Sequence, residues 1–216
     1  MLPPPPPPIV APAWPDTPVA RLEALAMLQS LELALVTQDS ATLVLDDWCA
    51  RHHLAPPGTK IVADRQFGAN HDAPADVRAS LHVSADTPLN YRLVHLRCGE
   101  RVMSIAENWY VPARLTAEMN RALDNTDTSF GRVVRPLGFR RTTLASRLLW
   151  SPLGEDWSTI GDGTANRTQV AQNLTIPSRV IENRAVLVLP DGAPFAYVIE
   201  NYTAAVLAAP PPALGR

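Results

Sequence analysis

The spacing of hydrophobic positions changes from helical to alternating along the chain. Leu and Ala recur at helical spacing over residues 18–37, directly after Thr17 and Pro18, which are typical of an N-cap and a first helical position. A second helical pattern covers residues 40–54 and ends before a Pro-Pro-Gly segment. From residue 89 onward the pattern alternates with period two. The sequence therefore predicts two helices followed by strands.

Two β-hairpins dominate the alternating part. The first covers residues 89–98 and 101–111 around Gly99, and the second covers residues 178–190 and 193–207 around Gly192. Further predicted elements are strands over 60–67 and 140–150, a short helix near 75–81, a short helix or turn at 130–132, and a helix over 116–125 with Thr116 as its N-cap. Helices followed by a mostly antiparallel sheet indicate an α+β fold, with the helices 18–37 and 40–54 over one face.

The two hairpins share a short echo, "SIAENWYVPA" at 104–113 and "YVIENYTAAV" at 197–206. Glu107 and Glu200 each follow a turn glycine by eight positions and precede Asn and an aromatic residue. We interpret this as a weak internal duplication that places two hairpins about a pseudo-twofold in one sheet. Strand alternation then puts both carboxylates, and Arg92, among apolar neighbours. A carboxylate in such surroundings has a raised pKa or a cationic partner.

Two interpretations of these residues stay open. In the first, an Arg–Glu pair holds the sheet together and has no other role. In the second, Arg92 grips a ligand carboxylate in an interior pocket while Glu200 handles a proton. We expect Glu107 to be structural in either case, tied to a neighbouring arginine or a backbone amide.

Charge and composition limit the partners. The net charge is −2, and eighteen of the nineteen basic residues are Arg, ten of them between Arg92 and Arg147. Arg suits bidentate binding of carboxylate or phosphate, although a solvated face explains many of these residues equally well. The region 18–54 carries only Arg21 and Arg51, so we expect no nucleic-acid binding. The chain contains no apolar run of 18 residues and no signal peptide as written, which predicts no membrane association and a cytoplasmic location.

The chain divides into one domain and two flanking segments. Six consecutive prolines predict a disordered arm over residues 1–16, followed by a single domain over 17–208 and a flexible tail over 209–216. Residues 151–177 are loop-rich. Cys49 and Cys98 fit no metal or redox motif, and we predict free thiols. Adjacent His52 and His53 face different ways on a helix, so no metal site is expected.

Five segments in this order resemble the chorismate pyruvate-lyase family, whose fold is shared with the UTRA ligand-binding domains of transcription regulators. They are "DSAT" at 39–42, "YRLVHLRCGERV" at 91–102, "YVPARLT" at 110–116, "TSFGRVV" at 128–134 and "DGAPFAYVIENY" at 191–202. The resemblance covers residues 39–207. It implies a lyase that removes pyruvate from chorismate to give 4-hydroxybenzoate, without a metal or cofactor.

The resemblance also implies roles for individual residues. Arg92 matches the arginine that binds the ring carboxylate, and Glu200 matches the active-site glutamate. Ala41 and Phe130 match positions that contribute backbone amides to the pocket, although the family usually has an aliphatic residue in place of Phe130.

Three further arginines are candidates for the second carboxylate of chorismate: Arg132, Arg135 and Arg140. Asn108 departs from the family, which carries a basic residue there. The alternative function is therefore a non-catalytic UTRA-like domain that binds a small anionic metabolite. The sequence predicts no oligomeric state.

Overall fold

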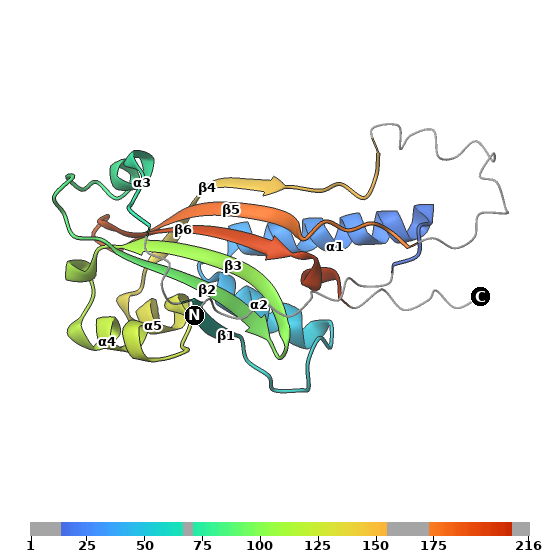
Figure 1. Cartoon of the computed structure of the whole chain (residues 1–216), viewed down its shortest axis with the longest axis horizontal. Coiled ribbons are helices and arrows are strands. Elements are labelled where there is room, and N and C mark those ends of the chain that lie inside the picture. Colours follow the sequence, from blue (N-terminus) through green and yellow to red (C-terminus); the bar gives the residue numbers. More distant parts are fainter. Residues whose placement is uncertain (1–13, 67–70, 155–172, 209–216) are drawn as a thin grey trace, which may run out of the picture.

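A six-stranded antiparallel sheet forms the centre of the protein (Figure 1). The computed structural model describes residues 14–66, 71–154 and 173–208. The strand order is β1-β2-β3-β6-β5-β4, so the two hairpins β2–β3 and β5–β6 lie side by side in one layer, as predicted. The strands are β1 (Val62–Gln66), β2 (Asn90–Cys98), β3 (Arg101–Tyr110), β4 (Arg140–Leu148), β5 (Arg179–Val188) and β6 (Pro194–Thr203).

The two long helices, α1 (Pro18–Thr37) and α2 (Ala41–Arg51), pack over one face of this sheet, behind it in Figure 1. Their buried leucines meet β2, β3 and β6 in the largest hydrophobic cluster of the described residues. The predicted caps of two helices are confirmed, because Thr17 accepts a hydrogen bond from Ala20 N and Thr116 accepts one from Met119 N. The predicted α+β class is likewise confirmed, and no helix of the described residues is long and apolar enough to cross a membrane.

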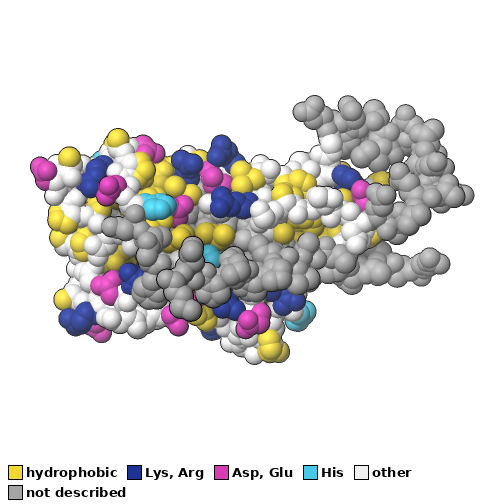
Figure 2. All heavy atoms as spheres, in the orientation of Figure 1, with side chains coloured by type: hydrophobic (Ala, Val, Ile, Leu, Met, Phe, Trp, Pro, Cys, Tyr) yellow, Lys and Arg dark blue, Asp and Glu magenta, His cyan; other side chains and the backbone are white. Residues whose placement is uncertain are grey.

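Shorter helices cover the remaining parts of the sheet. The helix α5 packs through Phe130 against Tyr110 and Ala196, and α3 packs through Val77 and Leu81 on the opposite face. That opposite face is turned to the viewer in Figure 2, where charged side chains of both signs are interspersed with hydrophobic ones. The short elements are α3 (Ala75–Ser80), η1 (Pro112–Arg114), α4 (Ala117–Asn125), α5 (Phe130–Val134), η2 (Arg135–Leu137) and η4 (Ala204–Leu207).

The register between the hairpins corrects the predicted placement of the two glutamates. In the antiparallel β3–β6 pair, Ala106 lies opposite Glu200 and Glu107 lies opposite Ile199. Neighbouring residues of a strand point to opposite faces, so Glu200 lies on the face covered by α1 and α2 and Glu107 lies on the other. A twofold axis normal to the sheet would place the two glutamates on the same face. Because they lie on opposite faces, the repeated sequence does not relate them by a local twofold.

The ordered domain begins earlier than the predicted boundary at residue 17. Trp14 belongs to the predicted arm 1–16 but is fully buried, and its indole nitrogen donates to Leu207 O over 2.8 Å. Pro15 also forms an isolated antiparallel bridge with Asn173. Burial of the large apolar indole draws Trp14 into the domain, and its N–H can be buried as well because it finds an acceptor. The rest of the arm (1–13), most of the loop-rich segment (155–172) and the tail (209–216) lie outside the described residues.

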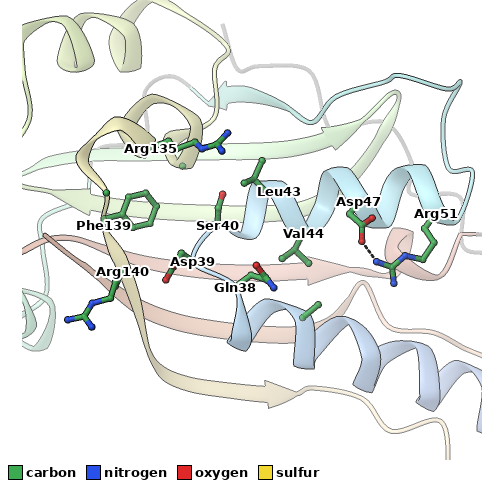
Figure 3. Close-up of a pocket in the computed structure, with 13 residues that line it drawn as sticks. Gln38, Asp39, Ser40, Leu43, Val44, Asp47, Arg51, Arg135, Phe139 and Arg140 are labelled. Carbon is green, nitrogen blue, oxygen red and sulfur yellow. Dashed lines mark hydrogen bonds and ion pairs between the residues drawn. The ribbon is translucent and has the colours of Figure 1, made fainter. Parts of the chain in front are cut away.

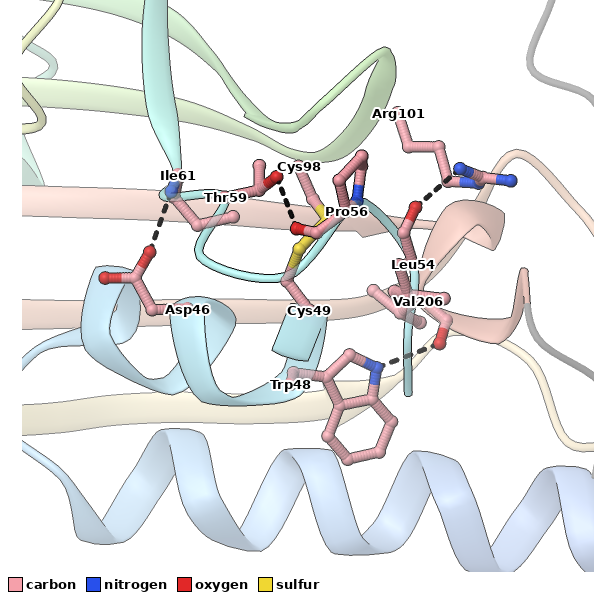
Figure 4. Close-up of a disulfide and its surroundings, with 10 residues drawn as sticks. All are labelled: Asp46, Trp48, Cys49, Leu54, Pro56, Thr59, Ile61, Cys98, Arg101 and Val206. Atoms are coloured by element: carbon pink, nitrogen blue, oxygen red, sulfur yellow. Dashed lines mark hydrogen bonds between the residues drawn. A yellow bond between two sulfur atoms is a disulfide. The ribbon is translucent and has the colours of Figure 1, made fainter. Parts of the chain in front are cut away.

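The prediction of two free thiols is wrong, because Cys49 and Cys98 form a disulfide that joins the last turn of α2 to the end of β2 (Figure 4). Their Cα atoms are 6.1 Å apart, which sequence spacing alone cannot reveal. Two further contacts fix α2: Asp46 accepts from the N–H of Ile61, just before β1, over 2.7 Å, and Trp48 donates to Val206 O in η4 over 2.9 Å. Disulfides are typical of oxidising compartments, which is at odds with the predicted cytoplasmic location.

The disulfide should contribute measurably to stability. It closes a loop with a sequence separation of 49 residues. Replacing both cysteines by alanine is expected to lower the free energy of unfolding by about 2–4 kcal/mol, because the unfolded chain regains the freedom that the crosslink removes. Denaturant titration of the two proteins measures the difference. Two titratable thiols in the unreduced, denatured wild-type protein would contradict the disulfide.

Candidate functional site

A small cavity lies between the N-terminus of α2, the start of α5 and the covered face of the sheet. Its volume is about 40 Å³. Val94, Leu96 and Ala106 form part of an apolar wall, and Asn108, Arg141 and Glu200 supply polar groups. The remaining lining residues are Asp39, Ser40, Ala41, Thr42, Phe130, Gly131, Phe139, Leu187 and Val198. An apolar enclosure with a few convergent polar groups is typical of a small-molecule site.

A buried ion pair joins two strands beside the cavity. Arg141 on β4 donates to both carboxylate oxygens of Glu200 on β6, over 3.3 and 2.7 Å, and Tyr202 OH donates to Glu200 Oε2 over 2.9 Å. Burial by itself lowers the pKa of Arg141, but the charge and hydrogen bonds of Glu200 outweigh it and leave that pKa raised. Burial and the charge of Glu200 raise the pKa of Tyr202, so the phenol keeps the proton that it donates.

Arg92 is a second buried cation next to this cavity. Its residue is only 1% exposed, and Nη2 donates to the carbonyl oxygens of Thr126 and Thr128 over 3.3 and 3.2 Å. Within the described part of the chain, Nε and Nη1 have no hydrogen-bond partner and no carboxylate forms an ion pair with the guanidinium. Burial, followed by the charge of Arg65, lowers the pKa of Arg92. Asp124 and Asp127 act on Arg92 in the opposite direction and raise its pKa, but no carboxylate of the described residues lies within ion-pair distance of the guanidinium.

The N-terminus of α2 supplies further donors. Ser40 is the N-cap residue, but its side chain makes no capping hydrogen bond, and Ser40 Oγ is buried without a partner among the described residues. The first amides of a helix have no acceptor within the helix, and here Ala41 and Thr42 line the cavity. A Cβ atom on Gly131 would lie 2.9 Å from Ser40 Oγ, so any other residue there would force the Ser40 side chain to shift.

A larger groove of about 700 Å³ opens outward from the same place (Figure 3). It runs between α2 and the η2 region, and its charged lining includes Arg135, Arg140 and the ion pair of Asp47 with Arg51. Four residues line both the groove and the cavity: Asp39, Ser40, Gly131 and Phe139. The groove and the cavity therefore adjoin each other.

The structure brings three of the four predicted site residues to one cavity. Ala41, Phe130 and Glu200 line it, whereas Arg92 does not. Arg92 adjoins it, because Asn108, its direct partner across β2 and β3, is a lining residue. The position of Arg92 on the same face as Glu200 follows from the register of β2, β3 and β6.

The other predicted charged residues have different partners from those expected. Arg132 forms an ion pair with Asp46 and so is not free to bind a ligand carboxylate, whereas Arg135 and Arg140 line the outer groove. Glu107 was expected to bind an arginine or a backbone amide. Its carboxylate instead accepts from Tyr91 OH over 2.9 Å and lies 3.9 Å from His71 Nδ1, because it faces the other side of the sheet.

Sequence reasoning missed Arg141 and Ser40. Two arginines, Arg140 and Arg141, stand side by side at the start of β4, and strand alternation requires one of them to face the helices. That rule could have marked one buried arginine, but the choice between them depends on the β4–β5 register, which pairs Arg141 with Leu187 and contains a bulge farther along. Nothing in the sequence distinguishes Ser40 from an ordinary helix cap.

The two glutamates should differ sharply in their effect on stability. Glu200→Gln leaves Arg141 buried without its counterion, so we expect the free energy of unfolding to fall by about 3–5 kcal/mol. Glu107→Gln affects a half-buried hydrogen bond to a neutral phenol, and we expect a loss of only about 0.5–1.5 kcal/mol. Denaturant titration of both variants tests this. Equal losses would show that the Arg141–Glu200 pair has no special structural weight.

Comparisons with known proteins give one close relative and several distant structures. The uncharacterized protein y4mC of Sinorhizobium fredii is 53% identical over 204 residues, which cover 93% of this chain and 84% of y4mC. No protein-family model matches the chain.

Among solved structures, the effector domain of PhnF from Mycobacterium smegmatis aligns at a TM-score of 0.48 and 14% identity, over 76% of this chain and 88% of that domain. The complete PhnF chain aligns at a TM-score of 0.48 and 13% identity, and the aligned part spans 64% of it. Likeness at this level carries no information about what this chain binds. The identity to y4mC, in contrast, extends over nearly the whole sequence, and the chain therefore belongs to the same family as y4mC of Sinorhizobium fredii.

Proposed function

We propose that this protein is a non-catalytic binding domain for a small anionic metabolite, which it holds in the inner cavity. One observation carries the proposal: several buried hydrogen-bond donors at or next to that cavity have no partner among the described residues. They are Arg141 Nε and Ser40 Oγ at the lining, and Nε and Nη1 of Arg92 beside it. An unsatisfied buried polar group costs about 1–3 kcal/mol, and more when it is charged, so a ligand that supplies acceptor oxygens removes that penalty.

The lining indicates the chemistry of the ligand. The donors fit a carboxylate, because arginine and helix amides both bind carboxylate oxygens well. The wall formed by Leu96, Val198, Leu187 and Phe139 fits an apolar body such as a ring. Glu200 is a poorer acceptor for a ligand hydroxyl, because both of its oxygens already accept hydrogen bonds from Arg141 or Tyr202.

The cavity must widen before such a ligand enters. Its volume of about 40 Å³ is far below the roughly 300 Å³ at which pockets for drug-sized ligands begin. Phe130 and Phe139 are the bulkiest side chains of the lining, and Phe139 also borders the outer groove. Displacement of these rings would join the cavity to the groove.

Removal of pyruvate from chorismate is the second candidate function. Its support is the placement of Ala41, Phe130 and Glu200 at one cavity with Arg92 adjoining, the four residues that the family resemblance singles out. Against it stands the state of Glu200. A general acid must carry and release a proton, whereas both oxygens of this carboxylate accept hydrogen bonds from Arg141. Catalysis would require Glu200 to leave that pair.

Binding and catalysis can be separated with one set of samples. Calorimetric titration of the purified protein with 4-hydroxybenzoate, and with chorismate, is expected to give saturable binding, while chromatography shows chorismate unchanged. Formation of 4-hydroxybenzoate above the rate without protein would establish the second candidate instead. Absence of binding for these and other small aromatic carboxylates would contradict the proposal.

Arg92→Met tests the part of the proposal that concerns the unpaired guanidinium. We expect ligand affinity to fall at least tenfold, because a charge-assisted hydrogen bond contributes about 1.5–3 kcal/mol. The unfolding temperature of the ligand-free protein should change little, because relief from burying a cation offsets the two lost carbonyl contacts. Arg147→Gln on the exposed part of β4 is the matched control and should bind normally. Unchanged affinity in Arg92→Met would remove Arg92 from the site.

A further inference from the structure

The outward face of α1 carries no charge. Six of its exposed positions form a stripe along the helix: Val19, Leu22, Ala26, Gln29, Leu33 and Val36. Leu33 is 63% exposed and Leu22 is 51% exposed, which are large values for leucine. The outward face of a surface helix normally consists of charged and polar residues. This stripe is instead apolar at five of six positions.

Among the described residues, the stripe is not the face through which α1 packs on the core. A different face of α1 packs on the core through Ala20, Ala24, Leu28, Leu31 and Leu35. The helix therefore has two apolar faces, and only one of them is covered by the described residues. A second apolar face of this length is expected to bind a partner.

The order of residues in the stripe identifies that partner. Successive positions are separated by 3, 4, 3, 4 and 3 residues, and the sequence Val, Leu, Ala, Gln, Leu, Val keeps its leucines and valines in place when read backward. The spacing of three and four is that of a coiled-coil seam. Because the pattern is the same in both directions, two copies of it match when they lie antiparallel. A twofold interface requires this kind of self-complementary surface.

We propose that α1 mediates a homodimer in which the stripe of one copy packs antiparallel against the stripe of a second copy. Val19 of one copy then faces Val36 of the other, Leu22 faces Leu33, and Ala26 faces Gln29 near the twofold axis. The short side chain of Ala26 allows the helices to approach at the centre. The proposal is independent of the ligand site.

The charges near the stripe agree with self-association. The helix has three charged residues, Arg21, Glu23 and Glu32. Arg21 is bound to Asp16 and to Pro152 O, and Glu32 accepts from Ser146 on β4. Only Glu23 has no such partner among the described residues, so two copies of this face do not repel each other strongly. A strongly acidic or basic partner, in contrast, would find no complementary charge on the stripe.

The size of the stripe predicts a weak dimer. A helix of 20 residues is about 30 Å long, and one helix pair of that length buries less than the roughly 800 Å² per partner of a standard interface. We therefore expect a monomer–dimer equilibrium that shifts with protein concentration over the micromolar range.

Sedimentation velocity of the full chain from about 1 to 200 µM tests the association. Wild-type protein is expected to shift from monomer toward dimer with concentration. Leu33→Glu should weaken association at least tenfold, the change that corresponds to about 1.4 kcal/mol, with an unchanged unfolding temperature because Leu33 is exposed. Leu144→Glu on β4, where the leucine is 50% exposed, is the matched control and should dimerise normally. A wild-type monomer at every concentration, or equal dimerisation of Leu33→Glu, would overturn the proposal.

Cysteine crosslinking tests the antiparallel arrangement. A mixture of Val19→Cys and Val36→Cys proteins is expected to form a crosslinked dimer under mild oxidation, whereas neither protein alone should do so efficiently. A parallel pair would give the reverse result, because each position would then face its own copy. Efficient crosslinking of either variant alone would therefore contradict the antiparallel pairing.

Discussion

The buried ion pair between Arg141 and Glu200 is the constraint around which one face of the sheet is organised. It connects the edge strand β4 with the central strand β6 across β5, and it lies beneath the start of α2. Charges buried this deeply are tolerated only when hydrogen bonds satisfy them. Tyr202 supplies one for the carboxylate, and Asp39 accepts from the backbone N–H of Arg141, which ties the segment before α2 to the same strand. The polar side of the cavity thus consists largely of the ion pair and the groups that bind the two strands carrying it.

The helix α2 is fixed at its middle and at its last turn, and this gives the site a preformed part. Its last turn is joined to β2 by the disulfide, and its middle is held by Asp46 and Trp48. Its first residues consequently lie at a defined place above the sheet, where Ser40 and Ala41 line the cavity. Donors that are already in position lose little entropy when a ligand binds, which favours recognition of a small molecule with few contacts.

Local pattern predicted the elements of this fold well. Short-range spacing and residue type, over neighbouring positions of the chain, are enough to predict the helices, both hairpins, the α+β class and the caps Thr17 and Thr116. The disulfide, in contrast, joins residues from two elements far apart in the chain, and the face of Glu107 depends on a one-residue offset between β3 and β6.

The same limit applied to the site. Ala41, Phe130 and Glu200 were placed at one cavity by family resemblance, but the ion-pair partner of Glu200 could not be identified, because the inward position of Arg141 is set by the pairing of β4 with β5. Residues that interact through register or through packing of distant elements are therefore the ones that sequence reasoning missed.

The central claim is that a small carboxylate binds among the unpartnered donors between α2 and the sheet. A crystal structure of the protein grown with 4-hydroxybenzoate tests it most directly. The account predicts density for the ligand under the N-terminus of α2, with its carboxylate oxygens within hydrogen-bonding distance of Arg141 Nε or of the free nitrogens of Arg92. A ligand bound only in the outer groove, or on the opposite face of the sheet near Glu107, would contradict it.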